Sequence, residues 1–85
     1  MASILIVDDS ASTRIAMKVL LQREGHIVGV AEDGFQGLKA IETVCPDAMV
    51  MDVIMPDMDG YTLLHRIRTH ASPAIRALPV VCMTG

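Results

Sequence analysis

The sequence predicts an α/β fold built on one parallel β-sheet. Four short aliphatic runs lack the alternation of strands exposed on one face, and the segments between them carry apolar residues at helical spacing. Such an order of elements is typical of parallel strands joined by right-handed crossover helices. The predicted strands cover residues 3–7, 26–30, 48–52 and 80–83. With 85 residues in all, the chain has room for one small domain, residues 1–85.

The first helix is predicted over residues 11–24, directly after the first strand. Either Ser10 or Ser12 can cap its start, and Gly25 stands where a left-handed residue would end it. We expect one apolar stripe to face the sheet, with Arg14 on the opposite side. The stripe consists of Ala11, Ile15, Val19 and Leu20.

Two further helices are predicted. Asp33 and Gln36 resemble a capping box that opens a helix over residues 34–44, which Pro46 stops. Its expected inward residues are Phe35, Leu38 and Ile41. The next helix follows Gly60 and carries Leu63, Leu64, Ile67 and Ala71 at helical spacing. Residues 72–78 are expected to be irregular.

Composition excludes several classes of function. The net charge is −3 and the basic residues are scattered, so no nucleic-acid surface is expected. No run approaches the roughly 18 apolar residues of a membrane span, and no secretory signal precedes the first strand, so we expect a cytoplasmic protein. Cys45 and Cys82 lack metal-site spacing, and Cys82 is expected in the core.

Acidic residues follow two of the predicted strands. Asp8 and Asp9 come after the first strand, Asp52 ends the third, and Thr84 follows the fourth. In open parallel sheets the ligand site lies beyond the carboxyl ends of the strands. We therefore expect these side chains to face one pocket.

Three carboxylates in one pocket repel one another unless one is protonated or a cation joins them. An all-oxygen, carboxylate-rich site suits a hard ion such as Mg²⁺. Asp8 and Asp9 would hold the ion, and Asp52 would share one oxygen with it. The other oxygen of Asp52 could then attack phosphorus, with the Thr84 hydroxyl donating to a phosphoryl oxygen.

The ordered set of these motifs resembles the receiver domain of two-component response regulators. It comprises Val-Asp-Asp-Ser at residues 7–10, Met-Asp at 51–52, Met-Pro-Asp-Met-Asp-Gly at 55–60 and Pro-Val-Val-Cys-Met-Thr-Gly at 79–85. The resemblance implies a flavodoxin-like, three-layer sandwich with strand order 2-1-3-4-5. It also implies a signalling module that is not an enzyme.

The resemblance also implies roles for single residues. Asp52 would be the phosphoacceptor, taking a phosphoryl group from a sensor histidine kinase or a phosphotransfer protein. Mg²⁺ would be bound by Asp8, Asp9, Asp52 and the main-chain oxygen of Ile54. Thr84 would be the switch hydroxyl, and Pro56 and Gly60 would shape the loop that presents the Ile54 carbonyl.

The sequence departs from the family pattern after the fourth strand. The last two helices, the fifth strand and the lysine that follows it have no counterpart, so we expect a truncated receiver domain. The edge of the fourth strand and one sheet face would then be exposed. We expect a homodimer or a domain-swapped oligomer through these surfaces. The alternative function is a fragment that cannot switch and acts by self-association or partner binding.

Other readings of the same residues remain open. Asp8 and Asp9 could only cap the first helix, and Thr84 could bond locally. Met55 and Met58 could be partly exposed to a partner, while Asp57 and Asp59 would serve the turn and the helix start. His26, His65 and His70 are expected at the surface. An aspartyl phosphohydrolase would need an acid where Ile54 stands, and a nucleotide hydrolase would need a Gly-rich phosphate loop.

Overall fold

A computed structural model describes residues 1–83. Its sheet has four parallel strands in the order β2-β1-β3-β4. In chain order the elements are β1 (Ser3–Val7), α1 (Ala11–Arg23), β2 (Ile27–Ala31), α2 (Gly34–Thr43), β3 (Ala48–Asp52), α3 (Gly60–Arg68), α4 (Pro73–Arg76) and β4 (Val80–Met83). The predicted class and the order of the first four strands are confirmed.

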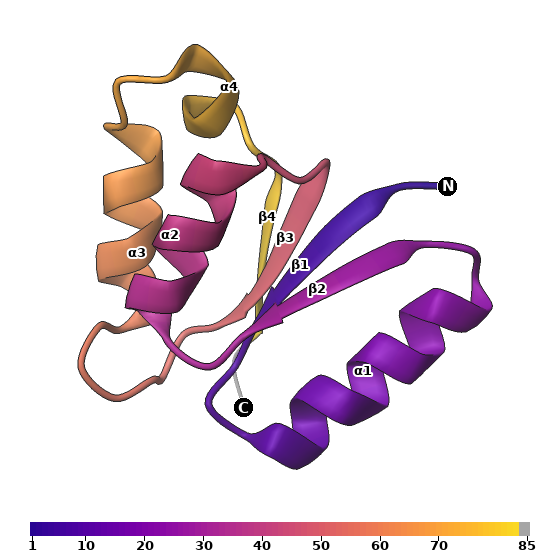
Figure 1. The fold of residues 1–85 in the computed structure, drawn as a ribbon. Helices are drawn as coiled ribbons and strands as arrows, with labels where there is room; N and C mark the ends of the chain where they lie inside the picture. Colours follow the sequence, from indigo (N-terminus) through magenta and orange to yellow (C-terminus); the bar gives the residue numbers. More distant parts are fainter. Residues whose placement is uncertain (84–85) are drawn as a thin grey trace.

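The elements form three layers (Figure 1). Helices α2 and α3 cover one face of the sheet, while α1 lies on the other face against β1 and β2. The main core fills the space between the sheet and α2 with α3. It includes Val7, Met49, Met51, Leu63 and Ile67, each fully buried. No helix in this described part of the chain is long and apolar enough to cross a membrane.

The predicted helix signals act as expected. Ser10 caps α1 by accepting a hydrogen bond from the Thr13 N–H, and Gly25 adopts the left-handed conformation after it, with φ of 88°. The Asp33 carboxylate accepts from the Gln36 N–H at 2.8 Å. The Gln36 side chain in turn accepts from the backbone N–H of Glu32, so both residues help to fix the start of α2.

Several element boundaries differ from the sequence prediction, and α1 and α2 each end one residue earlier than predicted, at Arg23 and Thr43. Strand β2 runs one residue later than residues 26–30, because the His26 N–H closes the turn onto the Leu21 carbonyl. Helix α3 ends at Arg68, so Ala71 lies outside it and is exposed. The region expected to be irregular contains the one-turn helix α4, which has a capping serine, Ser72, and a proline at its first position.

Several side chains expected in the core are exposed. On α1, Ile15 is 63 % and Leu20 59 % exposed, because this helix covers β1 and β2 only and its outer stripe has nothing to pack against in residues 1–83. Ala11 and Val19 of the same stripe are also exposed. Cys82 is exposed because β4 is the edge strand of the described sheet.

Helix α2 buries Ile41 and packs Leu38 against the core as predicted, but Phe35 does not face inward. Its buried residues are Gly34, Gly37 and Ile41, while Phe35 is 52 % exposed. A Cβ atom at Gly37 would lie 3.0 Å from a methyl group of Val7, so the glycine side of the helix lies directly on the sheet. This close approach decides which side of α2 faces the sheet and leaves Phe35 at the boundary with solvent.

Two of the three histidines are half-buried rather than on the surface. The Nδ1 atom of His26 accepts a hydrogen bond from the Ala2 N–H at 3.1 Å. The ring of His70 lies between the Ser72 N–H, 3.0 Å from Nδ1, and the Glu42 carboxylate, 2.7 Å from Nε2. These rings therefore have structural partners, whereas His65 is exposed as expected.

The cap of α3 leads to a pH-dependence prediction. The Thr62 backbone N–H donates to the Asp59 carboxylate at 2.7 Å, and this bond, with help from the Thr62 hydroxyl, lowers the pKa of Asp59 below its ordinary value of 3.8. The folded state thus binds this proton less tightly than the unfolded state. Its stabilisation is full above the ordinary value and is lost as the pH falls through the folded-state pKa.

Asp59→Asn keeps a capping oxygen but removes the titration. Urea unfolding from about pH 6 to about pH 3 should show a smaller loss of stability in the variant than in the parent chain. Parallel pH profiles for the two proteins would contradict this account of the cap.

Candidate metal centre

Three acidic side chains meet at the carboxyl edge of the sheet. In β1 and β3, Val7 and Met51 are register partners, so the next residues, Asp8 and Asp52, stand level on adjacent strands. Together with Asp9 they offer carboxylate oxygens that all lie within 4.8 Å of one another. The prediction that these acids share one pocket is confirmed.

Asp8 is fixed from several directions. It is only 4 % exposed, and its Oδ1 accepts a hydrogen bond from the Ser10 N–H at 2.8 Å. Its own N–H donates to the Ala31 carbonyl of β2 at 3.1 Å. Asp9, by contrast, is exposed, and within residues 1–83 its carboxylate has no hydrogen-bond partner. The pair therefore offers one rigid and one adjustable carboxylate.

Arg14 belongs to this site, although the sequence prediction placed it on the outer side of the first helix. Its Nη1 donates to the main-chain carbonyl of Asp8 at 2.6 Å. A cation in the first turns of a helix faces the positive end of the helix dipole. That unfavourable position, six residues after an acid, is the sequence signal that could have revealed the contact.

Asp52 is held by a local backbone bond. Its Oδ1 accepts from the Ile54 N–H at 3.1 Å, and the side chain is half-buried at the end of β3. The carboxylate is thus oriented yet reachable from solvent. The main-chain oxygen of Ile54 remains a predicted ligand, and Thr84 lies outside the described residues.

The loop after β3 turns back sharply toward the strand end. The Gly60 N–H donates to the Val53 carbonyl at 2.7 Å, and a Cβ atom at Gly60 would lie 2.7 Å from the Val53 Cα. Asp57 adopts a left-handed conformation with φ of 67°, and Asp59 caps α3. The turn and helix-start roles predicted for these two acids are confirmed.

The loop methionines are not exposed to a partner, contrary to one sequence hypothesis. Met55 is 7 % and Met58 3 % exposed. Met58 packs over Gly34, where a Cβ atom would come within 2.8 Å of the Met58 sulfur. Met58 thus anchors the loop to the start of α2, and both methionines belong to the main core.

The donor set fits a hard divalent cation. Mg²⁺ binds oxygen at about 2.1 Å, so two of its ligands are at most about 4.2 Å apart. The carboxylate oxygens, within 4.8 Å of one another, need to draw together only slightly to share one ion. A cation would also relieve the repulsion among the three charges. Asp8, Asp9 and Asp52 therefore fit the Mg²⁺ that the sequence predicts.

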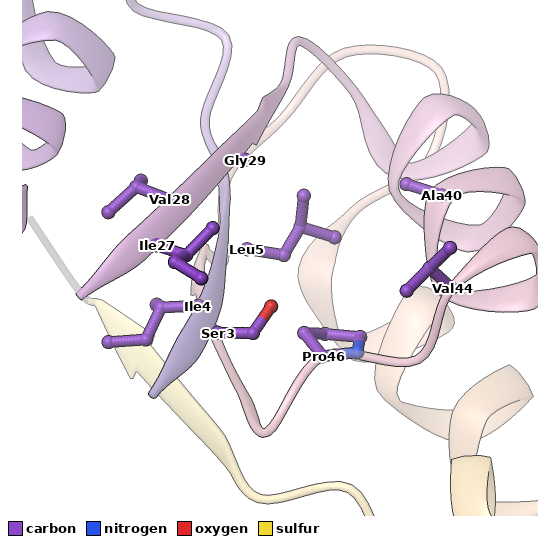
Figure 2. Close-up of a pocket in the computed structure, with 9 residues that line it drawn as sticks. All are labelled: Ser3, Ile4, Leu5, Ile27, Val28, Gly29, Ala40, Val44 and Pro46. Carbon is purple, nitrogen blue, oxygen red and sulfur yellow. The ribbon is translucent and has the colours of Figure 1, made fainter. Parts of the chain in front are cut away.

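A separate hollow lies near the amino-terminal ends of β1 and β2, away from the acidic residues (Figure 2). It has a volume of about 260 Å³ and lies between the first residues of β1 and β2 and the end of α2. Its lining consists of Ser3, Ile4, Leu5, Ile27, Val28, Gly29, Ala40, Val44 and Pro46, with no charged side chain. It is not part of the acidic site.

Comparison with known proteins agrees with this geometry. Residues 4–85 match the family model described as response regulator receiver domain. The chain is 40 % identical over 82 residues to an uncharacterized 14.6 kDa protein encoded in the sodA1 3′ region of Leptolyngbya boryana. It is 36 % identical over 85 residues to the transcriptional regulatory protein AfsQ1 of Streptomyces coelicolor.

A solved structure gives the same result. The N-terminal domain of a response regulator receiver protein from Methanoculleus marisnigri superimposes with a TM-score of 0.91 at 35 % identity, covering 96 % of this chain and 65 % of the other. The two sequence relatives are longer as well. The alignment with the Leptolyngbya protein covers 96 % of this chain and 61 % of that protein. The alignment with AfsQ1 covers 100 % of this chain and 36 % of AfsQ1.

The tight loop yields a stability prediction. Gly60→Ala should lower the free energy of unfolding by about 1–3 kcal/mol, because the new methyl group meets backbone atoms of Val53 and Asp52 that cannot rotate away. Urea unfolding followed by far-UV circular dichroism measures the change.

The matched control is Gly29→Ala. A Cβ atom there would meet only the Leu5 side chain, at an ordinary 3.5 Å, so the effect should stay within about 0.5 kcal/mol. Equal changes in the free energy of unfolding for the two variants would show that the loop does not depend on the close approach of Gly60 to Val53.

Proposed function

The chain belongs to the response regulator receiver domain family, and on that premise we propose that Asp52 accepts a phosphoryl group from a phosphohistidine. The donor would be a sensor histidine kinase or a phosphotransfer protein. The observation that carries this proposal is the meeting of Asp8, Asp9 and Asp52 at the carboxyl edge of the sheet.

The transfer needs one free oxygen on Asp52. The Ile54 N–H occupies Oδ1 and fixes the plane of the carboxylate. A carboxylate oxygen attacks phosphorus, the new O–P bond forms, and the P–N bond to the donor imidazole breaks with its electron pair returning to nitrogen. The product is an aspartyl phosphate, which water later hydrolyses to restore the carboxylate.

Asp8, Asp9, Asp52 and the main-chain oxygen of Ile54 would hold Mg²⁺ in this proposal. When bound, the cation neutralises charge on the transferring phosphoryl group. Asp8 contributes a preset ligand, since its carboxylate is buried and bonded to the Ser10 N–H. The Thr84 hydroxyl would donate to a phosphoryl oxygen, and this role rests on the family resemblance alone.

The proposed role of the chain is signal reception rather than turnover of a substrate. One relative, AfsQ1, is described as a transcriptional regulatory protein, and the chain corresponds to only part of it. A cytoplasmic location belongs to the same proposal, because the two exposed thiols, Cys45 and Cys82, suit a reducing compartment.

Phosphorylation by a small donor tests the proposal directly. With Mg²⁺ and acetyl phosphate, the chain should gain one phosphoryl group by mass spectrometry, and hydroxylamine should remove it as expected of an acyl phosphate. Asp52→Asn should abolish the gain. Asp9→Asn should slow it by at least about tenfold, because a ligand of the cation is lost.

Asp57→Asn is the matched control. Asp57 is an exposed acid of the adjacent loop that lies outside the acidic cluster, and asparagine accepts its left-handed conformation. This variant should be labelled like the parent chain. Labelling that persists in Asp52→Asn would mean that another residue is the phosphoacceptor.

A second candidate function, association without switching, rests on exposed apolar surface. Ile15 and Leu20 of α1 and Val81 of β4 are each 58 % or more exposed. Val81 is the register partner of Val50, which alternates with the core residues Met49 and Met51, so Val81 points to the sheet face that α1 covers. In this proposal β4 edges of two copies pair, or copies exchange elements, to give a homodimer or domain-swapped oligomer. Another protein could occupy the same surface.

Self-association is tested by size-exclusion chromatography with light scattering. The chain should elute as a dimer or larger species at micromolar concentration, and Val81→Lys should shift it toward monomer because a charge on an edge strand opposes pairing. A clean monomer of the parent chain would exclude self-association. Arg23→Glu, on the solvent side near the end of α1, is the control for a change of surface charge alone.

A further inference from the structure

We propose that Arg14 is a positioning residue of the cation site, which orients Asp9 by holding the peptide group that joins it to Asp8. The inference builds on the proposed Mg²⁺ role. Arg14 lies outside the Val-Asp-Asp-Ser motif at residues 7–10. The contact that carries it is the 2.6 Å hydrogen bond from Arg14 Nη1 to the main-chain oxygen of Asp8.

The carboxylate of Asp9 has few contacts of its own. Its side chain is exposed and, within residues 1–83, its carboxylate has no hydrogen-bond donor. The backbone on either side therefore sets the direction of its Cα–Cβ bond, while the carboxylate beyond it stays adjustable. On the far side, the Ser10 N–H is bonded to the Asp8 carboxylate at 2.8 Å.

Arg14 restrains the backbone on the near side of Asp9. The carbonyl of Asp8 and the N–H of Asp9 belong to one planar peptide group, so a bond to the carbonyl oxygen fixes that plane. The N–H of Asp8 is already bonded to the Ala31 carbonyl. With Arg14 in place, both peptide groups of Asp8 are held, and the start of the Asp9 backbone is fixed with them.

The charge of Arg14 and its contact with Asp8 have opposite effects on the affinity of the site for a cation. Arg14 brings a positive charge close to a site for a cation, which by itself weakens cation binding. Removal of the charge alone would therefore tighten Mg²⁺ binding. If the guanidinium serves to position Asp9, its removal weakens binding instead. The sign of the change separates the two roles.

The experiment compares Arg14→Met, Arg14→Lys and Arg23→Met with the parent chain. Mg²⁺ affinity is measured by ¹H–¹⁵N NMR titration, without any phosphoryl donor. Arg14→Met should bind Mg²⁺ about tenfold more weakly, the size of effect seen when a partner of a metal ligand is lost. Arg14→Lys, which keeps a donor and the charge, should recover part of the affinity.

Arg23→Met removes the same charge from the other end of α1, where the side chain is exposed, and should bind like the parent chain. Unchanged or tighter binding by Arg14→Met would overturn the proposal. If Arg14→Met proved unfolded, Arg14→Lys would decide the matter, because a positioning role requires its affinity to fall below that of the parent chain.

A metal-free measurement keeps this inference separate from the proposed function. Backbone ¹⁵N relaxation of the Asp9 amide should show greater mobility in Arg14→Met than in the parent chain. A parent chain that binds no Mg²⁺ would remove the metal role, and the Asp9 mobility would still decide whether Arg14 fixes this peptide. Identical mobility of the Asp9 amide in both proteins would overturn the positioning role of Arg14.

Discussion

The parallel pairing of β1 with β3 is the constraint on which the site depends. Because Val7 is the register partner of Met51, the two strands end at the same level, and Asp8 and Asp52 follow side by side. A slip of one residue would send each side chain of the strand to the opposite face. The buried residues Val7 and Met51 prevent that slip, so packing of the core also fixes the geometry of the acids.

Local backbone hydrogen bonds hold two of the acids in place against the mutual repulsion of the three carboxylates. Asp8 accepts from the N–H of Ser10 and Asp52 from that of Ile54, each two residues further along the chain. This local pattern is typical of aspartate at turns. Asp9 has no such bond within residues 1–83 and depends on the peptide group before it, which Arg14 contacts. Two of the three carboxylates are therefore preset, and the third is adjustable.

The two faces of the sheet differ in how completely helices cover them. On one face α2 lies close to the strands through Gly37, and Met58 closes the space above Gly34. On the other face α1 covers β1 and β2, while apolar side chains such as Ile15 and Val81 remain exposed in residues 1–83. The core under α2 and α3 fixes the ends of β1 and β3, and Arg14 of α1 contacts the Asp8 carbonyl from the other face. Association is the proposed use of that face.

The sequence by itself determined the order of the four strands and of α1, α2 and α3, the Asp33 cap and the meeting of the three acids, because these follow from local periodicity, local hydrogen bonds and the shared edge of parallel strands. It did not show α4, and it left the cap of α1 open between Ser10 and Ser12. It did not determine which apolar side chains are buried. Phe35 and Cys82 are exposed and Met58 is buried because their surroundings come from other elements: the glycine contact of α2, the edge position of β4 and the close fit of the loop over α2. The contact of Arg14 with Asp8 likewise needed the angle at which α1 leaves β1, which only the tertiary structure decided.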